Sequence, residues 1–293
     1  MSDQTLQYVY FGGEPIGVPV LERLIDRGLR PALVVCNPDR QAGRGHHLTP
    51  PPVKVCANKY DIPVWQPNDL ADRTSITEYL KDHDLFVVVA YNRILPQWLI
   101  ELPRYQTINV HPSLLPRRRG PNPIRSAIAE NDRDSIGVSI MLMDAQMDHG
   151  PILAQRALPI DDEQWPMRGP LLDQALAECG GTLLAETIPS WVAGMTEPIP
   201  QAHEQATYTT KLTRSDGELT LDPRALPTGE EARTTLRLIR AYEGWPGTFF
   251  FHEGKRIKVN AATIIDDHLV LESVTPEGKA PQPFAQWLPS NNR

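Results

Sequence analysis

The sequence predicts an α/β domain with a mostly parallel, Rossmann-like sheet, followed by a small OB-like β-barrel domain. Over the first two-thirds of the 293 residues, short apolar runs alternate with segments of helical period, which is the pattern of strand-helix units around a parallel sheet. One run, residues 85–90, is apolar throughout, as expected of a strand buried on both faces. After residue 206 the helical period largely stops, and short β-prone runs replace it.

The first domain is predicted to begin with a strand at residues 6–11, the turn Gly12-Gly13 and a helix. The turn has the sequence GGEPIG rather than G-x-G-x-x-G, so it is a weak indication of a dinucleotide site. Residues 37–52 are predicted to form a long loop, because they hold two glycines, four prolines and no apolar period. The remaining predictions are strands at 32–36, 63–65, 85–90, 107–110, 136–143 and 152–157, and helices at 53–60, 76–80 and 171–192.

The second domain is predicted from its strands, which are expected at 247–251, 256–261 and 269–273, with one helix at 230–242. A proline-containing stretch between the two periodic regions indicates a linker. The expected organisation is a first domain at 1–193, a linker at 194–206 and a C-terminal domain at 207–293.

Composition narrows the class of protein. The hydrophobic content of 41% and charged content of 22% are ordinary for a globular chain. Three cysteines, Cys36, Cys56 and Cys179, show no CxxC spacing, which argues against a zinc site and for free thiols in a reducing compartment. The chain has no apolar run of 18 residues and no N-terminal signal pattern. We therefore expect a cytoplasmic protein without a metal or a membrane span.

The net charge of −7 is unevenly distributed along the chain. Residues 206–293 hold eleven Lys and Arg and eleven Asp and Glu, so the whole acidic excess belongs to residues 1–205. Within that acidic part, residues 30–59 carry five basic side chains and one acidic side chain, Asp39. A local basic segment on an acidic body is compatible with a polyanion that is bound at one place.

Three polar residues suited to catalysis follow the predicted strands. Asn109 and His111 are two positions apart, so an extended backbone places both side chains on one face. The predicted strand at 136–143 breaks at Asp144 into a loop that carries Asp148. Ligands bind at such strand-end loops in open α/β sheets. A histidine at such a place is more often structural, and an aspartate beside a glycine more often forms a turn. The prediction of a catalytic group therefore depends on the combination of the residues.

The string that begins at Asn109 combines Asn-x-His, SLLP, an arginine run that ends in Gly120, and Asp-x-Gly 37 positions after the histidine. It resembles the formyltransferase family that uses 10-formyltetrahydrofolate as formyl donor, and AYNRILP resembles the segment of that family that faces the folate pterin. The resemblance implies that Asn109, His111 and Asp148 are catalytic. It also implies a folate site formed by Arg93, Ile94, Leu95, Ser113, Leu114, Leu115, Pro116 and Asp144.

The implied chemistry suits these side chains. Transfer of a formyl group from a folate nitrogen to an amine passes through a tetrahedral intermediate whose oxygen gains negative charge, so the site needs preorganised donors at that oxygen. Asn109 and His111 can supply them. Asp148 is expected to orient the histidine ring, to favour its protonated form and to hold a water that relays the amine's proton.

Two further stretches resemble those members of the family that act on tRNA. The string PDRQAGRGHHLTPPPVK resembles their insertion that contacts the acceptor end of the tRNA, which implies phosphate contacts from Arg40, Arg44, His46 and His47. The C-terminal strings YTTKLTRSDGELTLD, GWPGTFF and TPEGKAPQPFAQWL resemble the same members, so the C-terminal domain is expected to bind tRNA. The expected partners are an initiator methionyl-tRNA and the folate co-substrate, and a monomer is expected.

Two departures from the family pattern concern the acceptor. Ile16 lies in a segment where an aromatic residue is expected, and Pro112 follows the histidine where tRNA-acting members more often have Ala or Gly. The string HPSLLP is common in relatives that act on sugars or glycinamide ribonucleotide. Two alternatives therefore stay open, a nucleotide-amino-sugar N-formyltransferase and a non-catalytic RNA-binding protein on this scaffold. The intact catalytic group argues against the second.

Overall fold

The computed structural model describes residues 6–42 and 47–288, which divide into two compact units. Unit 1 comprises the residues up to Arg119, Ile136–Leu158 and Gln174–Tyr208. Unit 2 comprises Gly120–Ser135, Pro159–Asp173 and the residues from Thr209 onward. Each unit is thus assembled from segments that are separated in the sequence.

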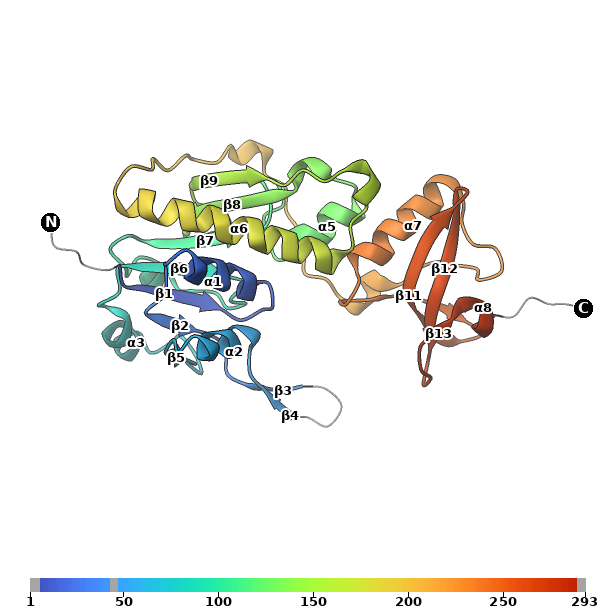
Figure 1. The fold of residues 1–293 in the computed structure, drawn as a ribbon, viewed down its shortest axis with the longest axis horizontal. Coiled ribbons are helices and arrows are strands. Elements are labelled where there is room, and N and C mark those ends of the chain that lie inside the picture. Colours follow the sequence, from blue (N-terminus) through green and yellow to red (C-terminus); the bar gives the residue numbers. More distant parts are fainter. Residues whose placement is uncertain (1–5, 43–46, 289–293) are drawn as a thin grey trace, which may run out of the picture. The chain divides into compact units, whose positions relative to one another are not determined.

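Unit 1 contains a seven-stranded sheet in the order β5-β2-β1-β6-β7-β8-β9 (Figure 1). The strands from β5 to β7 are parallel, whereas β8 is antiparallel to both of its neighbours. The parallel strands therefore share one carboxyl edge, where ligands bind in sheets of this kind. The strands are β1 (Tyr8–Gly12), β2 (Leu33–Val35), β5 (Val64–Trp65), β6 (Leu85–Val89), β7 (Thr107–His111), β8 (Gly137–Leu142) and β9 (Ile152–Ala157).

The helices that accompany this sheet are α1 (Gly17–Asp26), α2 (Pro52–Lys59), α3 (Arg73–Leu80), α4 (Gln97–Ile100) and α6 (Gly169–Val192). Helix α6 runs through Gly180 and Gly181 without a break. A Cβ at Gly180 would meet Val110 Cγ1 at 3.0 Å, and one at Gly181 would meet Arg23 Cβ at 2.8 Å. The two glycines therefore let α6 approach the sheet and α1 closely.

The core of unit 1 lies where the apolar strand residues meet the helices. Buried residues of β1, β2 and β6 pack with Ile76 and Leu80 of α3, and the rings of Phe11 and Phe86 lie 5.2 Å apart. All five residues of β6 are buried, as the sequence predicted for a strand covered on both faces. This packing fixes the strand ends that carry the candidate site.

Unit 2 is a small antiparallel β domain with helices. Its strands β10 (Thr248–His252), β11 (Lys255–Ile265), β12 (His268–Pro276) and β13 (Gln282–Pro283) pair in that order. Helix α7 (Gly229–Ala241) packs its apolar side on the sheet, where Leu236 and Ile239 join the buried cluster. The unit also contains α5 (Pro123–Ala129), α8 (Phe284–Trp287) and the 3-10 turns at Arg133–Ser135, Asp162–Gln164 and Arg214–Gly217.

The predicted mostly parallel α/β domain followed by a small antiparallel β domain is confirmed. The long loop predicted at 37–52 is not irregular throughout, because it contains the antiparallel strands β3 (Arg40–Ala42) and β4 (His47–Thr49). The sequence does not reveal these strands because both are short and exposed, and neither shows an alternation of apolar and polar residues. They form only because they pair with each other. Among residues 6–42 and 47–288, no helix is both long and apolar enough to cross a membrane.

The packing of the strand core in unit 1 allows us to predict how much stability a cavity there would cost. Phe86→Ala removes a fully buried ring, so the free energy of unfolding of this unit should fall by about 3–5 kcal/mol. Leu48→Ala, at a side chain that is 69% exposed, should change it by less than about 0.5 kcal/mol. Urea unfolding followed by tryptophan fluorescence measures both, since Trp65 and Trp98 pack against this cluster. Equal losses in the two variants would contradict this assignment of the core.

Candidate active site

The candidate site is built on the last residues of β7. Asn109 pairs with Val88 of β6 on one side and Met141 of β8 on the other, so its position is fixed by two neighbouring strands. His111 ends the strand opposite Ser139 and is buried. Asn109 is only partly buried, and its side-chain amide makes no hydrogen bond with any described residue. The amide is therefore available to a ligand.

Both ring nitrogens of His111 face acceptors. Nε2 lies 2.9 Å from the carbonyl oxygen of Arg118, and because a carbonyl only accepts, Nε2 carries a proton. Nδ1 lies 3.5 Å from Oδ1 of Asp148. The two side chains are only 5% and 14% exposed, so the pair is largely shielded from water. The ring is thus held by the backbone on one side and faces a carboxylate on the other.

Asp148 lies in the loop between β8 and β9, with a left-handed backbone at φ 51°. Aspartate tolerates this conformation better than most residues. Gly150 closes the same loop, where a Cβ would lie 2.0 Å from the carbonyl oxygen of Leu142. Only glycine fits so close to a backbone, and this approach brings the loop back to the end of β8.

Gln201 holds the loop from outside it. Its Nε2 donates to the carbonyl oxygens of Asp148 at 2.9 Å and Gly150 at 2.7 Å. Its Oε1 accepts from Nη2 of Arg119 at 2.7 Å and from Nε at 3.1 Å. Gln201 and Arg119 are 5% and 1% exposed. A buried guanidinium and a buried amide therefore fix the backbone of the candidate catalytic carboxylate.

Two histidines continue this network beside the loop. Nη2 of Arg119 donates to Nδ1 of His203 at 2.8 Å, and the His203 ring stacks on the His149 ring at a centroid distance of 4.1 Å. Nδ1 of His149 lies 2.7 Å from Oδ2 of Asp144. Oδ1 of Asp144 accepts from the backbone N–H of Gln146 at 2.9 Å. Asp144, which the sequence places on the folate side, thus has both oxygens engaged within the loop.

The predicted folate segment at 113–116 lies next to the site, and its side chains differ in availability. The Ser113 hydroxyl donates to the Arg117 carbonyl at 2.7 Å, and Leu115 is buried with Met141 and Ile152. Leu114 and Pro116 are partly exposed. A ligand at this place would therefore meet the backbone and the sides of those two residues.

The second predicted folate segment, at 93–95, follows β6. Nη1 of Arg93 donates to the Pro67 carbonyl at 3.0 Å, and Leu95 belongs to the buried core. Ile94 is 91% exposed, which is unusual for a large apolar side chain and available for a ligand to cover. The three side chains therefore have different environments, and only Ile94 faces solvent freely.

Two buried polar atoms near the same strand ends have no partner among the described residues. They are Oδ1 of Asn37, which follows β2, and the hydroxyl of Tyr91, which follows β6. Nδ2 of Asn37 donates to the Tyr91 carbonyl at 3.0 Å, so the two residues are adjacent. Burial raises the pKa of Tyr91, and its hydroxyl stays protonated as a donor. An acceptor and a donor without partners suit a polar heterocycle such as a pterin.

Of the predicted tRNA contacts, Arg40 and His47 lie on the exposed β3-β4 hairpin, whereas Arg44 and His46 lie outside the described residues. The basic excess of this region is partly neutralised, because Nζ of Lys54 lies 2.8 Å from Oδ1 of Asp39. Among the residues that the structure describes, no cluster of three His, Cys, Asp or Glu could hold a metal.

Comparison with known proteins defines the class. The formyl transferase family matches residues 8–183. The methionyl-tRNA formyltransferase of Roseiflexus sp. (strain RS-1) is 37% identical, over 96% of this chain and 91% of its own. A sugar N-formyltransferase structure from Shewanella sp FDAARGOS_354 superposes with a TM-score of 0.66 at 16% identity, over 89% of this chain and 99% of its own. HypX from Aquifex aeolicus, solved with tetrahydrofolic acid, gives 0.64 at 16% identity, over 98% of this chain and 47% of its own.

The chain belongs to the formyl transferase family, as the sequence predicted. Within that family, the methionyl-tRNA formyltransferases of Chloroflexus aggregans (strain MD-66 / DSM 9485) and Halorhodospira halophila (strain DSM 244 / SL1) are 35% and 41% identical to it. The sequence interpretation missed Gln201 and Arg119. Gln201 lies in the predicted linker without any local pattern, and Arg119 was one residue of a basic run. Only their burial in the folded chain distinguishes them.

The clamp on the Asp148 loop predicts different effects for two variants of Gln201. Gln201→Glu keeps an acceptor for Arg119 but loses the donor to the two loop carbonyls, whereas Gln201→Ala loses both. Turnover should fall at least about 10-fold in both variants, because misplacement of a reacting group is costly. The melting temperature should fall more in the alanine variant, since it leaves a buried charge with fewer acceptors.

Steady-state kinetics and thermal unfolding measure the two quantities separately. Gln205→Ala, at an exposed neighbour on the same segment, is the control and should match the wild type. Both Gln201 variants lose the donor, so both should lose turnover. If turnover instead fell in proportion to the melting temperature, the proposed role of Gln201 in holding the Asp148 loop would be contradicted.

Proposed function

We propose that this chain transfers the formyl group of 10-formyltetrahydrofolate to the α-amino group of an initiator methionyl-tRNA. The observation that carries this is 37% identity over 96% of the chain to a methionyl-tRNA formyltransferase. The side chains that the chemistry requires, Asn109, His111 and Asp148, are present at the strand ends. The neighbouring segments at 93–95 and 113–116, with the unpartnered atoms of Asn37 and Tyr91, suit a bound folate.

Asn109 is the proposed donor to the developing oxyanion. As the amine nitrogen attacks the formyl carbon, the carbonyl oxygen gains negative charge, and a fixed N–H near that oxygen lowers the barrier. The Asn109 amide is fixed by its strand and has no partner among the described residues. It therefore needs no rearrangement before it can donate.

His111 and Asp148 are the proposed proton-handling pair. The Nε2 proton of His111 is engaged by the Arg118 carbonyl, so Nδ1, which faces Asp148, is the position that gains and loses a proton. The attacking amine must lose a proton as its C–N bond forms, and the departing folate nitrogen must gain one. A histidine beside a carboxylate can support both transfers, and a protonated Nδ1 would add positive charge near the oxyanion.

Two other parts of the chain are proposed to position the acceptor. The exposed hairpin with Arg40 and His47, together with Arg44 and His46, would contact phosphates near the acceptor end. The proposed catalytic domain spans residues 1–193 and the linker spans 194–206. The C-terminal domain, residues 207–293, would bind the body of the tRNA. We propose that the protein acts as a cytoplasmic monomer. Its three cysteines are free, and burial raises the pKa of Cys36 and Cys56 to about 11.

One assay of formyl transfer tests both the choice of acceptor and the roles of His111 and Asp148. Wild-type protein with 10-formyltetrahydrofolate should formylate methionyl-tRNA and leave a nucleotide-linked amino sugar unmodified. His111→Ala and Asp148→Asn should each lower turnover at least about 100-fold while folate binding survives, because they remove transition-state interactions.

His83→Ala, at a partly buried histidine outside the strand-end group, is the matched control and should retain activity. Formylation of the amino sugar in preference to the tRNA would reject the proposed acceptor. Near wild-type turnover of either site variant would remove that residue from the mechanism.

The basic hairpin segment is tested by salt dependence. If Arg40 and Arg44 contact phosphates, replacing both with Ala should raise the KM for tRNA and reduce the slope of log affinity against log salt by about 1 per lost contact. The KM for the formyl donor should not change. Arg27→Ala with Arg104→Ala removes the same charge from exposed positions of unit 1 outside the basic segment and should preserve the slope. An unchanged slope in the Arg40/Arg44 variant would place the phosphate contacts elsewhere.

A further inference from the structure

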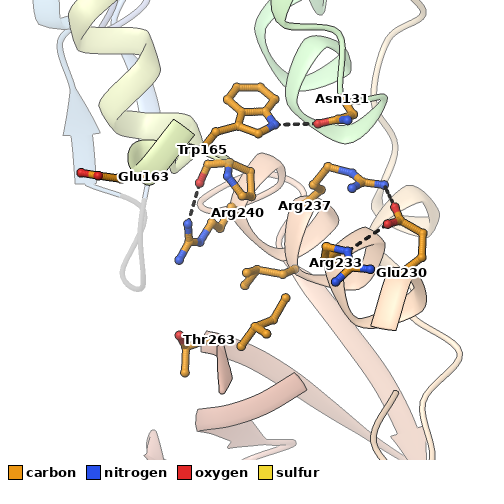
Figure 2. Close-up of a pocket in the computed structure, with 11 residues that line it drawn as sticks. Asn131, Glu163, Trp165, Glu230, Arg233, Arg237, Arg240 and Thr263 are labelled. Atoms are coloured by element: carbon orange, nitrogen blue, oxygen red, sulfur yellow. Dashed lines mark hydrogen bonds and ion pairs between the residues drawn. The ribbon is translucent and has the colours of Figure 1, made fainter. Parts of the chain in front are cut away.

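Unit 2 contains a pocket of about 500 Å³ that formyl transfer does not use. Helix α7 forms one side of it, the segment around Trp165 another, and β11 contributes Thr263 and Ile264 (Figure 2). Sites for small molecules commonly occupy about 300–1,000 Å³. The pocket is therefore large enough for a single small ligand.

Three arginines of α7 line the pocket, and they differ in their partners. Arg233 and Arg237 both pair with Glu230, and Arg233 also pairs with Asp267. Arg240 makes no ion pair with any described carboxylate, and its one hydrogen bond runs from Nη1 to the Pro166 carbonyl at 2.6 Å. Partial burial lowers the pKa of Arg240, and the neighbouring Glu243 is engaged by Arg168. Arg240 is thus a partly buried cation with unused donors, which is a favourable partner for an anion.

Arg237 supplies a second guanidinium to the pocket. Its Nε is buried, and no described residue accepts a hydrogen bond from it. Its side chain is 14% exposed and lines the same pocket as Arg240, one helical turn away. Buried N–H groups of charged side chains are rarely left without an acceptor. Nε has no surface on the pocket, so a ligand there would instead accept from Nη1, which makes no hydrogen bond with any described residue.

Trp165 gives the pocket a flat aromatic wall. Its Nε1 donates to Oδ1 of Asn131 at 2.6 Å, which fixes the orientation of the indole (Figure 2). Leu236 and Ile264 add apolar surface. Nucleobases stack on such fixed aromatic rings, and this stacking is tolerant of base identity. Cζ of Arg133 lies 5.7 Å from the centroid of the Trp165 ring, so a base would stack on the other face of the ring, with its anion at Arg240.

The charge balance selects among anions. Two of the three lining arginines are paired, with Glu230 and Asp267, which leaves the single positive charge of Arg240 without a carboxylate partner among the described residues. One phosphodiester carries a single negative charge and balances it, whereas a triphosphate would leave several uncompensated negative charges beside the glutamates. We infer that this pocket binds one nucleotide, with its phosphate at Arg240 and Arg237 and its base against Trp165. The chemistry is common to a free mononucleotide and to a nucleotide within an RNA chain, and only the RNA case rests on the proposed function.

Binding to the full-length protein, without formyl donor, tests the inference. Calorimetric titration with AMP and with CMP should show one site, and inorganic phosphate should bind more weakly because it has no base. Arg240→Gln should weaken nucleotide binding at least about tenfold. Arg224→Gln, which removes the same charge from an exposed position of unit 2 outside the pocket, should leave it unchanged. Trp165→Leu should bring nucleotide affinity down to that of inorganic phosphate.

A parallel titration with a single-stranded oligonucleotide identifies the source of the ligand. Tighter binding of the oligonucleotide than of AMP, with the same dependence on Arg240, indicates a nucleotide of an RNA chain, and the reverse order indicates a free nucleotide. Both results support the site. Equal affinity of phosphate and nucleotides, no binding of either probe, or equal effects at Arg240 and Arg224 would overturn it.

Two measurements keep the test valid if Arg240→Gln does not fold. Arg240→Lys keeps the charge but loses the planar donor fork, and should weaken binding less than the glutamine variant. In the wild type, the indole N–H resonance of Trp165, assigned from Trp165→Phe, should shift on addition of AMP. An unmoved resonance would overturn the site. Because none of these readouts involves formyl transfer, failure of the pocket and failure of the proposed activity can be told apart.

Discussion

A buried positive charge organises the end of unit 1 that holds the candidate active site. The guanidinium of Arg119 is almost wholly removed from water, which is unfavourable unless its donors find acceptors, and Gln201 and His203 provide them. Satisfying Arg119 therefore fixes Gln201, and Gln201 fixes the carbonyls of Asp148 and Gly150. The preceding residue, Arg118, accepts from the His111 ring through its own carbonyl. Two consecutive residues thus position both members of the His111–Asp148 pair.

This arrangement explains why the site is built from so few polar side chains. Backbone carbonyls accept from the His111 ring and from Gln201, so these two contacts do not use the side chains of Asn109 and Asp148. Backbone carbonyls have no side-chain rotamers to change, so they supply a more rigid frame than a ring of side chains would. The left-handed backbone at Asp148 is maintained by the same hydrogen bonds.

The sequence was sufficient for the features that depend on local pattern. The uninterrupted apolar run of β6 predicts a buried strand, and all five of its residues are buried. The two-residue spacing of Asn109 and His111 places both side chains on one face of a strand, and both residues lie on β7. It was insufficient where a partner distant in the chain decides the structure. Nothing local distinguishes Gln201 from other polar residues of a proline-rich stretch, and the β3-β4 ladder exists only through pairing. The pocket in unit 2 likewise combines α7 with a segment more than 60 residues earlier, which no window of sequence contains.

The interleaved order of the two units constrains how the chain is made. Helix α5 buries Ile124 and Ile128 and packs with α7, a helix that leaves the ribosome about 100 residues later, some 5–20 s at ordinary synthesis rates. Until then the apolar face of α5 lacks its partner, although most of the strands of unit 1 have already been synthesised. The nascent protein therefore passes through a stage in which most strands of unit 1 are present, while helix α5 of unit 2 exposes its apolar face. At that stage the chain offers a binding surface to molecular chaperones, and a ribosome that stalls there holds a species prone to aggregation.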